Sequence, residues 1–264
     1  MNSLAAKIIV CVLAGLGAGV GTGFAGMSAA VVISPMLIAF LNMDAYSAVG
    51  IALASDVLAS AVSAFTYARN KNIDIKNGLV MMFTVLLFTF VGSWTGKFMP
   101  SSTLGNLSFL TSFFIGLKFL IWPVKKTKEE MKEKSTKRKI IESILCGIYI
   151  GFVCGFMGAG GGLMMLFVLT TFMGYELKTA VGTSVFIMTF SALFGAGSHF
   201  VIGGTPDWLC LVLCAGSTLL FAELAARIAN KVEVKVLNRI TGIFLTVLGV
   251  IMLAFRIWQG NIAF

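Results

Sequence analysis

The sequence predicts an all-α polytopic membrane protein built from two inverted structural repeats. Of the 264 residues, 58% are hydrophobic and 12% are charged, whereas soluble domains carry about 25% charged residues. The apolar runs are long and do not alternate with polar residues, so they favour helices over the strands of a barrel. Each half holds a Gly-rich stretch inside an apolar region. We expect each repeat to contain a broken or re-entrant helix pair at this stretch followed by three full spans, about 8–10 membrane segments in all.

In the first half, polar or helix-breaking residues separate five apolar segments. The first segment lacks the basic start and the clear cleavage site of a signal peptide, so we expect it to stay in the mature protein. Gly23-Phe24-Ala25-Gly26 ends it, a basic turn follows the third segment, and Pro100 and Pro123 follow the fourth and fifth. The five segments are 4–22, 28–41, 47–68, 77–98 and 104–122.

The second half follows the same order after a charged linker at 124–139, which holds eight Lys or Arg and three Glu. Residues 155–162 contain five glycines in eight positions, and each glycine in a helix interior costs about 1 kcal/mol relative to alanine. A broken backbone survives in a bilayer only where protein or a wet cavity satisfies its polar groups. We therefore expect a solute site here, and the alternative is close helix packing through small residues. The segments are 140–157, 163–173, 178–202, 208–228 and 240–258.

An internal repeat relates the two halves. With a shift of 132 residues, 19–50 aligns with 151–182 without a gap and gives nine identities in 32 positions. Transporters are commonly built from two such halves, with broken helices forming the solute site. We therefore divide the chain into a first repeat at 1–123, the charged linker at 124–139 and a second repeat at 140–264.

The distribution of basic residues predicts the orientation of the repeats. If each broken pair enters the membrane and returns, 17 of the 20 Lys and Arg residues lie on one side, against 14 if each pair crosses once. The positive-inside rule favours the first arrangement, with both termini outside, a cytoplasmic linker and inverted repeats. The net charge of +9 is thus explained by membrane orientation, and we expect no nucleic-acid partner.

The second glycine stretch and the motif Ala180-Val181-Gly182-Thr183-Ser184 together resemble the sulfite exporter TauE/SafE family. The spacing is G-x-x-x-G-x-x-G-x-G-G-G, and a degenerate copy lies at 19–35 with Ala48-Val49-Gly50 after it. The resemblance covers nearly the whole chain. It implies transport of small sulfur-containing anions such as sulfite, thiosulfate or organosulfonates across the cell (inner) membrane, although some members carry other organic anions. The first copy departs from the pattern, because Met27-Ser28-Ala29-Ala30 replaces the glycine run.

Small oxyanions need hydrogen-bond donors and partial positive charge, which the amino-terminal ends of helices supply. Helices starting near Ser28 and after Gly162 would direct backbone N–H groups at a solute, and nearby hydroxyl groups would add donors. The candidate substrate-binding residues are therefore Gly23, Gly26, Met27, Ser28, Gly158, Ala159, Gly160, Gly161, Gly162, Ser55, Thr183 and Ser184.

Asp56 is the candidate proton-coupling residue, since an acid midway along a span is costly and functional by default. The alternative is a structural carboxyl group bonded to nearby Ser or Thr, or one facing water near the pore. For His199, the only histidine, we favour a structural role at the interface over pH sensing. Glu223 is expected to reach cytoplasmic water with help from Arg227.

The sequence favours a transporter over two other functions. An intramembrane enzyme would need a catalytic pair, and only Asp56 and His199 are available, so we expect no enzyme and no catalytic residues. A non-transporting scaffold is the remaining alternative. We expect no cofactor and no metal, because the cysteines all lie in apolar segments as buried thiols: they are Cys11, Cys146, Cys154, Cys210 and Cys214. Membrane lipid and coupling protons are the other expected partners.

Overall fold

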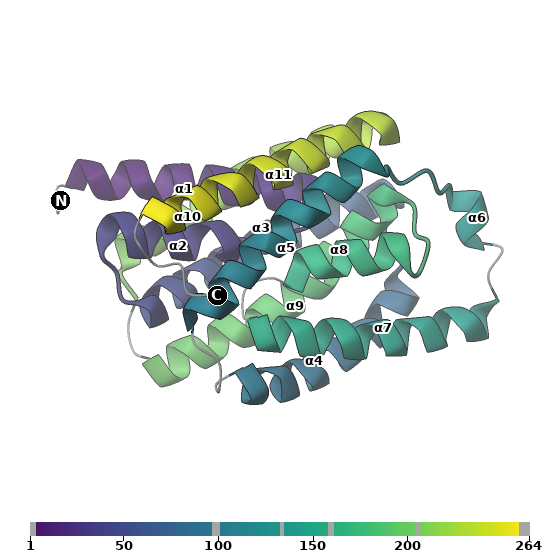
Figure 1. Cartoon of the computed structure of the whole chain (residues 1–264), viewed down its shortest axis with the longest axis horizontal. Coiled ribbons are helices and arrows are strands. Elements are labelled where there is room, and N and C mark those ends of the chain that lie inside the picture. The colour runs from purple at the N-terminus through teal and green to yellow at the C-terminus, as the bar shows by residue number, and fades with distance from the viewer. Residues whose placement is uncertain (1–3, 97–100, 133–134, 158–160, 204–205, 259–264) are drawn as a thin grey trace. The chain divides into compact units, whose positions relative to one another are not determined.

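The computed structural model describes residues 4–96, 101–132, 135–157, 161–203 and 206–258. This part of the chain is helical and contains no strand, as the hydropathy pattern predicts (Figure 1). The helices are α1 (Leu4–Ala25), α2 (Ala30–Leu41), α3 (Ala45–Arg69), α4 (Ile75–Gly96), α5 (Ser101–Ile121), α6 (Lys128–Lys132), α7 (Thr136–Met157), α8 (Gly161–Thr171), α9 (Leu177–Gly203), α10 (Trp208–Lys231) and α11 (Val234–Trp258).

Six of these helices are long and apolar enough to cross a membrane, by length and composition: α1, α3, α4, α9, α10 and α11. Helices α2 and α8 are much shorter, with 12 and 11 residues. At a rise of about 1.5 Å per residue they are roughly 17–18 Å long, which is little more than half of the hydrocarbon core. The chain is therefore a multi-pass membrane protein with one short helix in each half.

The helix bounds repeat along the chain with the period of the sequence repeat. Adding 132 to the bounds of α1 gives those of α7, and the starts of the next four helices agree to within one residue. The residues after α2 and α8 also match, because Asn42 and Gly174 both have left-handed backbone conformations, with φ of 50° and 67°. The inverted orientation of the repeats, and the boundaries that we gave them, stay predictions.

The helices form two compact units, and each unit draws helices from both halves of the chain. Unit 1 consists of Met1–Ile73 and Val181–Lys231, and unit 2 of Asp74–Ala180 and Val232–Phe264. Within unit 1, α1 packs against α10 and α3. Within unit 2, α7 packs against α4, and α11 against α5. The first helix of each half thus packs against the fourth helix of the other half.

Glycines make these helix contacts close. A Cβ atom on Gly19 of α1 would lie 2.5 Å from the backbone oxygen of Thr218 and 2.8 Å from the backbone nitrogen of Ala222, both on α10. A Cβ atom on the equivalent Gly151 of α7 would lie 2.5 Å from the backbone oxygen of Val85 on α4. Small residues let helix backbones approach in this way, which van der Waals packing in a membrane requires.

Helices α7 and α11 begin earlier than the sequence predicts. We expected starts at residues 140 and 240, and the helices begin at Thr136 and Val234. The apolar pattern predicts where a segment enters the membrane, but a helix continues into water where its charged residues are exposed and its polar residues find partners. At α11 that partner is the backbone of Val124, because Asn238 accepts a hydrogen bond from its N–H at 2.8 Å and donates to its carbonyl at 3.0 Å.

Asn238→Ala is expected to destabilise the protein by about 1–3 kcal/mol, because it leaves two polar groups of a buried residue, Val124, without their partner. Asn238 itself is 2% exposed. Thermal unfolding of the detergent-solubilised protein measures the effect. Lys235→Ala, at an exposed position one turn earlier in the same helix, is the control and should change stability by less than about 0.5 kcal/mol. Equal stability of Asn238→Ala and wild type would contradict the role of this amide.

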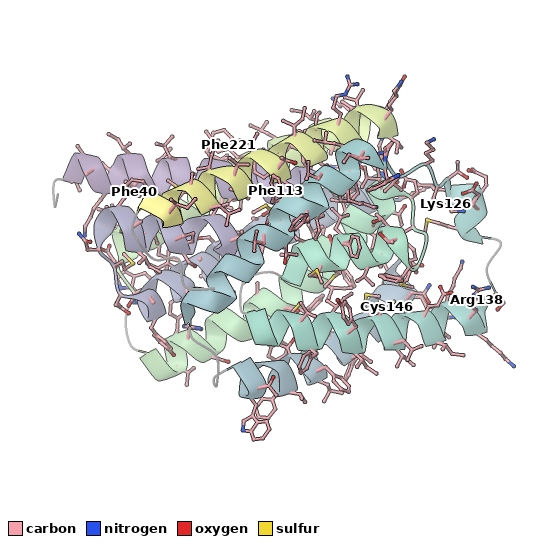
Figure 2. All side chains as sticks on the ribbon, in the orientation of Figure 1. Phe40, Phe113, Lys126, Arg138, Cys146 and Phe221 are labelled. Atoms are coloured by element: carbon pink, nitrogen blue, oxygen red, sulfur yellow. The ribbon has the colours of Figure 1, made fainter. Side chains whose placement is uncertain are left out.

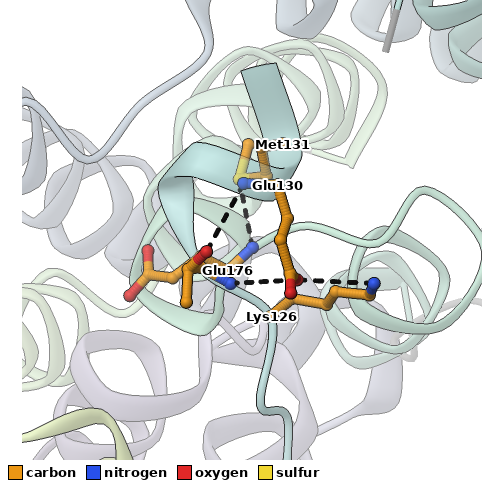
Figure 3. A network of polar contacts seen from close by, with 5 residues as sticks. Lys126, Glu130, Met131 and Glu176 are labelled. Carbon is orange, nitrogen blue, oxygen red and sulfur yellow. Dashed lines mark hydrogen bonds and ion pairs between the residues drawn. The ribbon is translucent and has the colours of Figure 1, made fainter. Parts of the chain in front are cut away.

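The charged linker contacts the helices of unit 2 through α6. The backbone N–H of Glu176, in the turn between α8 and α9, donates to the sulfur of Met131 at 3.1 Å, and Lys126 pairs with Glu130 at 3.4 Å (Figure 3). The Glu176 side chain caps α9 by accepting from the N–H of Thr179 at 3.0 Å. Lys126 and Arg138 are exposed in the same unit (Figure 2), so a large part of the linker's charge is solvated.

Candidate functional site

The first helix break lies in unit 1, between α1 and α2. Helix α1 ends at Ala25, and Gly26 has φ of 60°, a left-handed conformation that glycine adopts without steric cost. The N–H of Gly26 donates to the carbonyl of Thr22 at 3.0 Å, and the Thr22 hydroxyl donates to the carbonyl of Met27 at 3.0 Å. The chain therefore leaves α1 in a defined turn, and α2 begins at Ala30.

Asp56 of α3 meets the start of α2. Its side chain is 1% exposed. The Ser28 hydroxyl donates to one carboxylate oxygen at 2.6 Å and the Ser60 hydroxyl to the other at 2.9 Å. The backbone N–H of Ala29 also bonds this carboxylate. The amino-terminal end of α2, which we expected to face a solute, thus faces an acid of the protein itself.

One face of α3 is directed at the break over three helical turns. Asp56, Ser60, Ser63 and Tyr67 have the spacing i, i+4, i+7 and i+11, which places them on one side of a helix. Asp56 contacts Ser28 at one end of this face, and at the other end the Tyr67 hydroxyl donates to the carbonyl of Gly23 at 2.8 Å. We call these four side chains the α3 polar face.

Ser63 lies within this face and is 0% exposed, yet its hydroxyl has no hydrogen-bond partner in the described part of the chain. On the α3 polar face, Asp56 contacts Ser28 at one end of the break and Tyr67 contacts Gly23 at the other, so Ser63 lies on the helix face that is turned toward the break. Buried hydroxyl groups nearly always have a partner in native proteins. The unsatisfied Ser63 hydroxyl therefore indicates a place for a small polar ligand or a water molecule.

Helix α9 brings Ser184 to the same break. The Ser184 hydroxyl donates to the carbonyl of Val181 at 2.8 Å and lies 3.5 Å from the carbonyl of Gly26. A Cβ atom on Gly26 would lie 2.1 Å from this hydroxyl oxygen, so a side chain there would displace it. Thr183, the other hydroxyl residue of the motif, is 1% exposed.

Several predicted residues from both halves of the chain converge. The structure brings Gly26, Met27, Ser28, Asp56 and Ser184 together at the break in unit 1. Gly23 contributes its carbonyl to Tyr67, while its open side faces α10, where a Cβ atom would lie 2.5 Å from that of Ala225. The hydroxyl of Ser55 is buried and donates back to Ile51 of its own helix at 2.8 Å.

The second break lies in unit 2, between the end of α7 at Met157 and the start of α8 at Gly161. The apolar region 140–173 is therefore two helices, as the glycines predict, and α8 packs against α7. Gly161 approaches Cys154 of α7, since a Cβ atom there would lie 2.3 Å from its sulfur, and Gly162 is buried. The predicted site residues Gly158, Ala159 and Gly160 lie outside the described residues.

Sequence reasoning missed Ser60, Ser63 and Tyr67, although their helical spacing from Asp56 was a readable signal. The α3 polar face has no counterpart in the second half. A shift of 132 residues places Met188 opposite Asp56, Ala192 opposite Ser60, Gly195 opposite Ser63 and His199 opposite Tyr67. The acid and its two serines therefore belong to the first repeat alone.

A comparison with known protein families now identifies the chain. The family model described as sulfite exporter TauE/SafE matches residues 11–252, which include both breaks. The chain belongs to the TauE/SafE family. Two curated relatives from Bacillus subtilis (strain 168) are named probable membrane transporter proteins. YunE is 25% identical over 92% of this chain and 96% of its own length, and YdhB is 25% identical over 86% and 92%.

A third relative, a probable membrane transporter protein of Haemophilus influenzae, is 26% identical to the TauE/SafE chain over 93% of this chain and 97% of its own length. No solved structure shows significant similarity to the chain. The relatives and the membrane helices together show a multi-pass transporter of the plasma membrane.

Several other polar and ionisable side chains in the described part of the TauE/SafE chain have local contacts. Glu223 pairs with Arg227, as expected. His199 stacks on Tyr46 with ring centroids 4.3 Å apart. Lys7 donates to Asp207 at 2.7 Å, and this hydrogen bond holds the pKa of Asp207 below its ordinary value. The five cysteines are free thiols, and among the described residues no cluster of three or more His, Cys, Asp or Glu side chains is arranged for a metal.

Proposed function

We propose that this TauE/SafE transporter moves a small sulfur-containing anion, namely sulfite, thiosulfate or an organosulfonate, with Asp56 as the proton-coupling residue. Family membership supports transport, and the helix break in unit 1 supports a small anionic solute. Gly26, Met27 and Ser28 offer backbone at the turn, while Ser55, Thr183 and Ser184 are buried hydroxyl residues of α3 and α9. In the second half, residues 158–162 would offer the equivalent backbone groups.

The observation that carries the proposal is the buried carboxyl group of Asp56 at the start of α2. An acid in a membrane span is expensive unless it has a function or strong partners. Its partners in the structure are two serine hydroxyls and one backbone N–H group, and no cation is among them. A proton neutralises such a group without any other ligand, which suits a coupling role.

Transport is tested with radiolabelled thiosulfate and sulfite in proteoliposomes under an imposed pH gradient. Wild type is expected to accumulate one of these anions in proportion to the gradient, and Asp56→Asn to transport it without a response to the gradient. Asp44→Asn is the control, because Asp44 is exposed at the amino-terminal cap of the same helix and asparagine caps equally well. It should behave as wild type.

The possible outcomes separate the alternatives. An unchanged pH response in Asp56→Asn would remove Asp56 from coupling. Flux of other organic anions without flux of sulfur oxyanions would support transport but contradict the proposed solute class. The absence of any anion flux would favour a non-transporting scaffold.

A further inference from the structure

We propose that the Asp56 carboxylate occupies the solute's own anion position at the start of α2, so that a solute anion binds there only when Asp56 is protonated. This inference rests on the proposed function and adds to it the way in which proton and solute are linked. It defines one site, the break site, made by Gly26, Ser28, Asp56, Ser63 and Ser184.

The contacts of Asp56 are those that a bound oxyanion would make. A carboxylate and a sulfur oxyanion both carry negative oxygens that accept from hydroxyl and backbone N–H groups. Asp56 accepts from the Ser28 hydroxyl at 2.6 Å, from the Ser60 hydroxyl at 2.9 Å and from the N–H of Ala29. The end of α2 also carries a partial positive charge of about half an elementary charge, which stabilises either anion. The two anions therefore compete for the same donors.

Ser63 is a second, independent observation: its hydroxyl calls for a polar group, and a bound anion would supply one. Ser63 is fully buried, lies on the α3 polar face between Ser60 and Tyr67, and its hydroxyl has no partner in the described part of the chain. Ser63 does not donate to Asp56, because the two oxygens of that carboxylate accept from the hydroxyls of Ser28 and Ser60. An anion at the break would accept from this hydroxyl as well as from the donors that Asp56 releases.

The elements packed against Asp56 supply no competing charge. Helix α2 has no ionisable side chain. Lys7 of α1 pairs with Asp207, which precedes α10, and Glu223 of α10 pairs with Arg227. Lys231 lies at the far end of α10. The other ionisable groups of these two helices are thiols: Cys11, Cys210 and Cys214. In the part of α9 within unit 1, the ionisable group is His199, which stacks on Tyr46 near the start of α3. The charge of the break site therefore changes with pH through protonation of the Asp56 carboxylate.

The sequence of events follows from charge and donors. A proton from solvent binds one oxygen of Asp56 and stays there, so the carboxyl group becomes neutral and a weaker acceptor. Ser28 and the N–H of Ala29 are then free to donate to an incoming anion. When the proton leaves, the carboxylate regains these donors and repels the anion. Solute and proton therefore bind together and leave together.

Binding of thiosulfate to the purified protein tests this, measured by calorimetry between about pH 5 and pH 8. Thiosulfate stays a dianion in this range, so any pH dependence belongs to the protein. Wild type is expected to bind up to about tenfold more tightly for each unit that the pH falls, as linkage to one proton requires. Asp56→Asn should bind with one affinity at every pH, close to the low-pH value of wild type.

Ser63→Ala separates a ligand contact from a structural role. Because the hydroxyl has no partner now, its removal should leave thermal stability unchanged or slightly raised, yet thiosulfate affinity should fall several-fold. The Asp44→Asn control should keep the wild-type pH dependence.

The binding results distinguish failure of the competition from failure of the proposed solute class. A pH-independent affinity in wild type, or weaker binding by Asp56→Asn than by wild type throughout, would overturn the competition while leaving a thiosulfate transporter in place. If neither protein bound thiosulfate at any pH, the proposed solute class and this inference would both fail. Unchanged affinity in Ser63→Ala would remove Ser63 from the break site.

Discussion

Gly182→Ala is expected to destabilise the protein by about 1–3 kcal/mol or more, because an added methyl group has no room. A Cβ atom at Gly182 would lie 2.0 Å from the backbone oxygen of Asn72 and 2.8 Å from the Cβ atom of Tyr67. Asn72 is itself held in place, since its N–H donates to the carbonyl of Tyr67 at 2.9 Å and its amide to Asn230 at 2.6 Å. The backbone would have to move, and with it the end of α3 that carries Tyr67.

The internal repeat supplies a matched control for this variant. Gly50 occupies the equivalent position in the first half, but there a Cβ atom would lie 3.5 Å from its nearest neighbours, His199 and Phe200. That is ordinary van der Waals contact. Gly50→Ala should therefore be as stable as wild type or more stable, by up to about 1 kcal/mol from helix propensity.

Thermal unfolding of the two variants in detergent, followed by tryptophan fluorescence or by the loss of the monodisperse chromatographic peak, measures the contrast. A Gly182→Ala protein with wild-type stability would show that α9 does not approach the turn after α3 this closely.

The second large effect is expected for Gly19→Ala in α1. Its Cβ atom would meet backbone atoms of Thr218 and Ala222 at 2.5 and 2.8 Å. Because α1 would be forced away from α10, we expect a loss of about 1–3 kcal/mol and a lower yield of folded protein. The same displacement would disturb Gly23 and Gly26 at the end of α1, so transport should also fall.

Gly216→Ala is the control for this variant. Gly216 lies on α10, the partner helix, and a Cβ atom there would have nothing within 4 Å. The same chemical change should stabilise α10 slightly, because alanine is the better helix former. Opposite signs for the two substitutions would confirm close packing of α1 on α10, and a similar small effect in both would contradict it.

Much of the architecture was predictable because a bilayer imposes simple rules. The apolar segments and the break at the Gly-rich stretch follow from hydropathy, length and the behaviour of glycine. The starts of α7 and α11 were predicted too late, since exposed charges and the Asn238 contact with Val124 lie outside what hydropathy measures. Ser28, Asp56 and Ser184, which the sequence nominated, do lie at one break, while their role in binding a solute stays a prediction.

The pairing of the helices could not be read from the sequence. Gly19 and Gly151 were recognised as equivalent, but not that they face α10 and α4, because the partner of a small-residue stripe is decided by the whole fold. The partners of Asp56 were hidden for a similar reason. A hydrogen bond between Ser28 and Asp56 spans 28 residues, and only the return of α3 along α2 brings them together.

The sequence by itself determined that this protein lies in a membrane, that its halves repeat and where its helices are interrupted. These features depend on composition and on local backbone preference. Only the tertiary structure decided that the start of α2 is met by an internal carboxylate, and that the buried hydroxyl of Ser63 on the same face of α3 has no partner in the described part of the chain. Contacts of this kind depend on which helix faces which, and that is settled by side-chain packing across the chain.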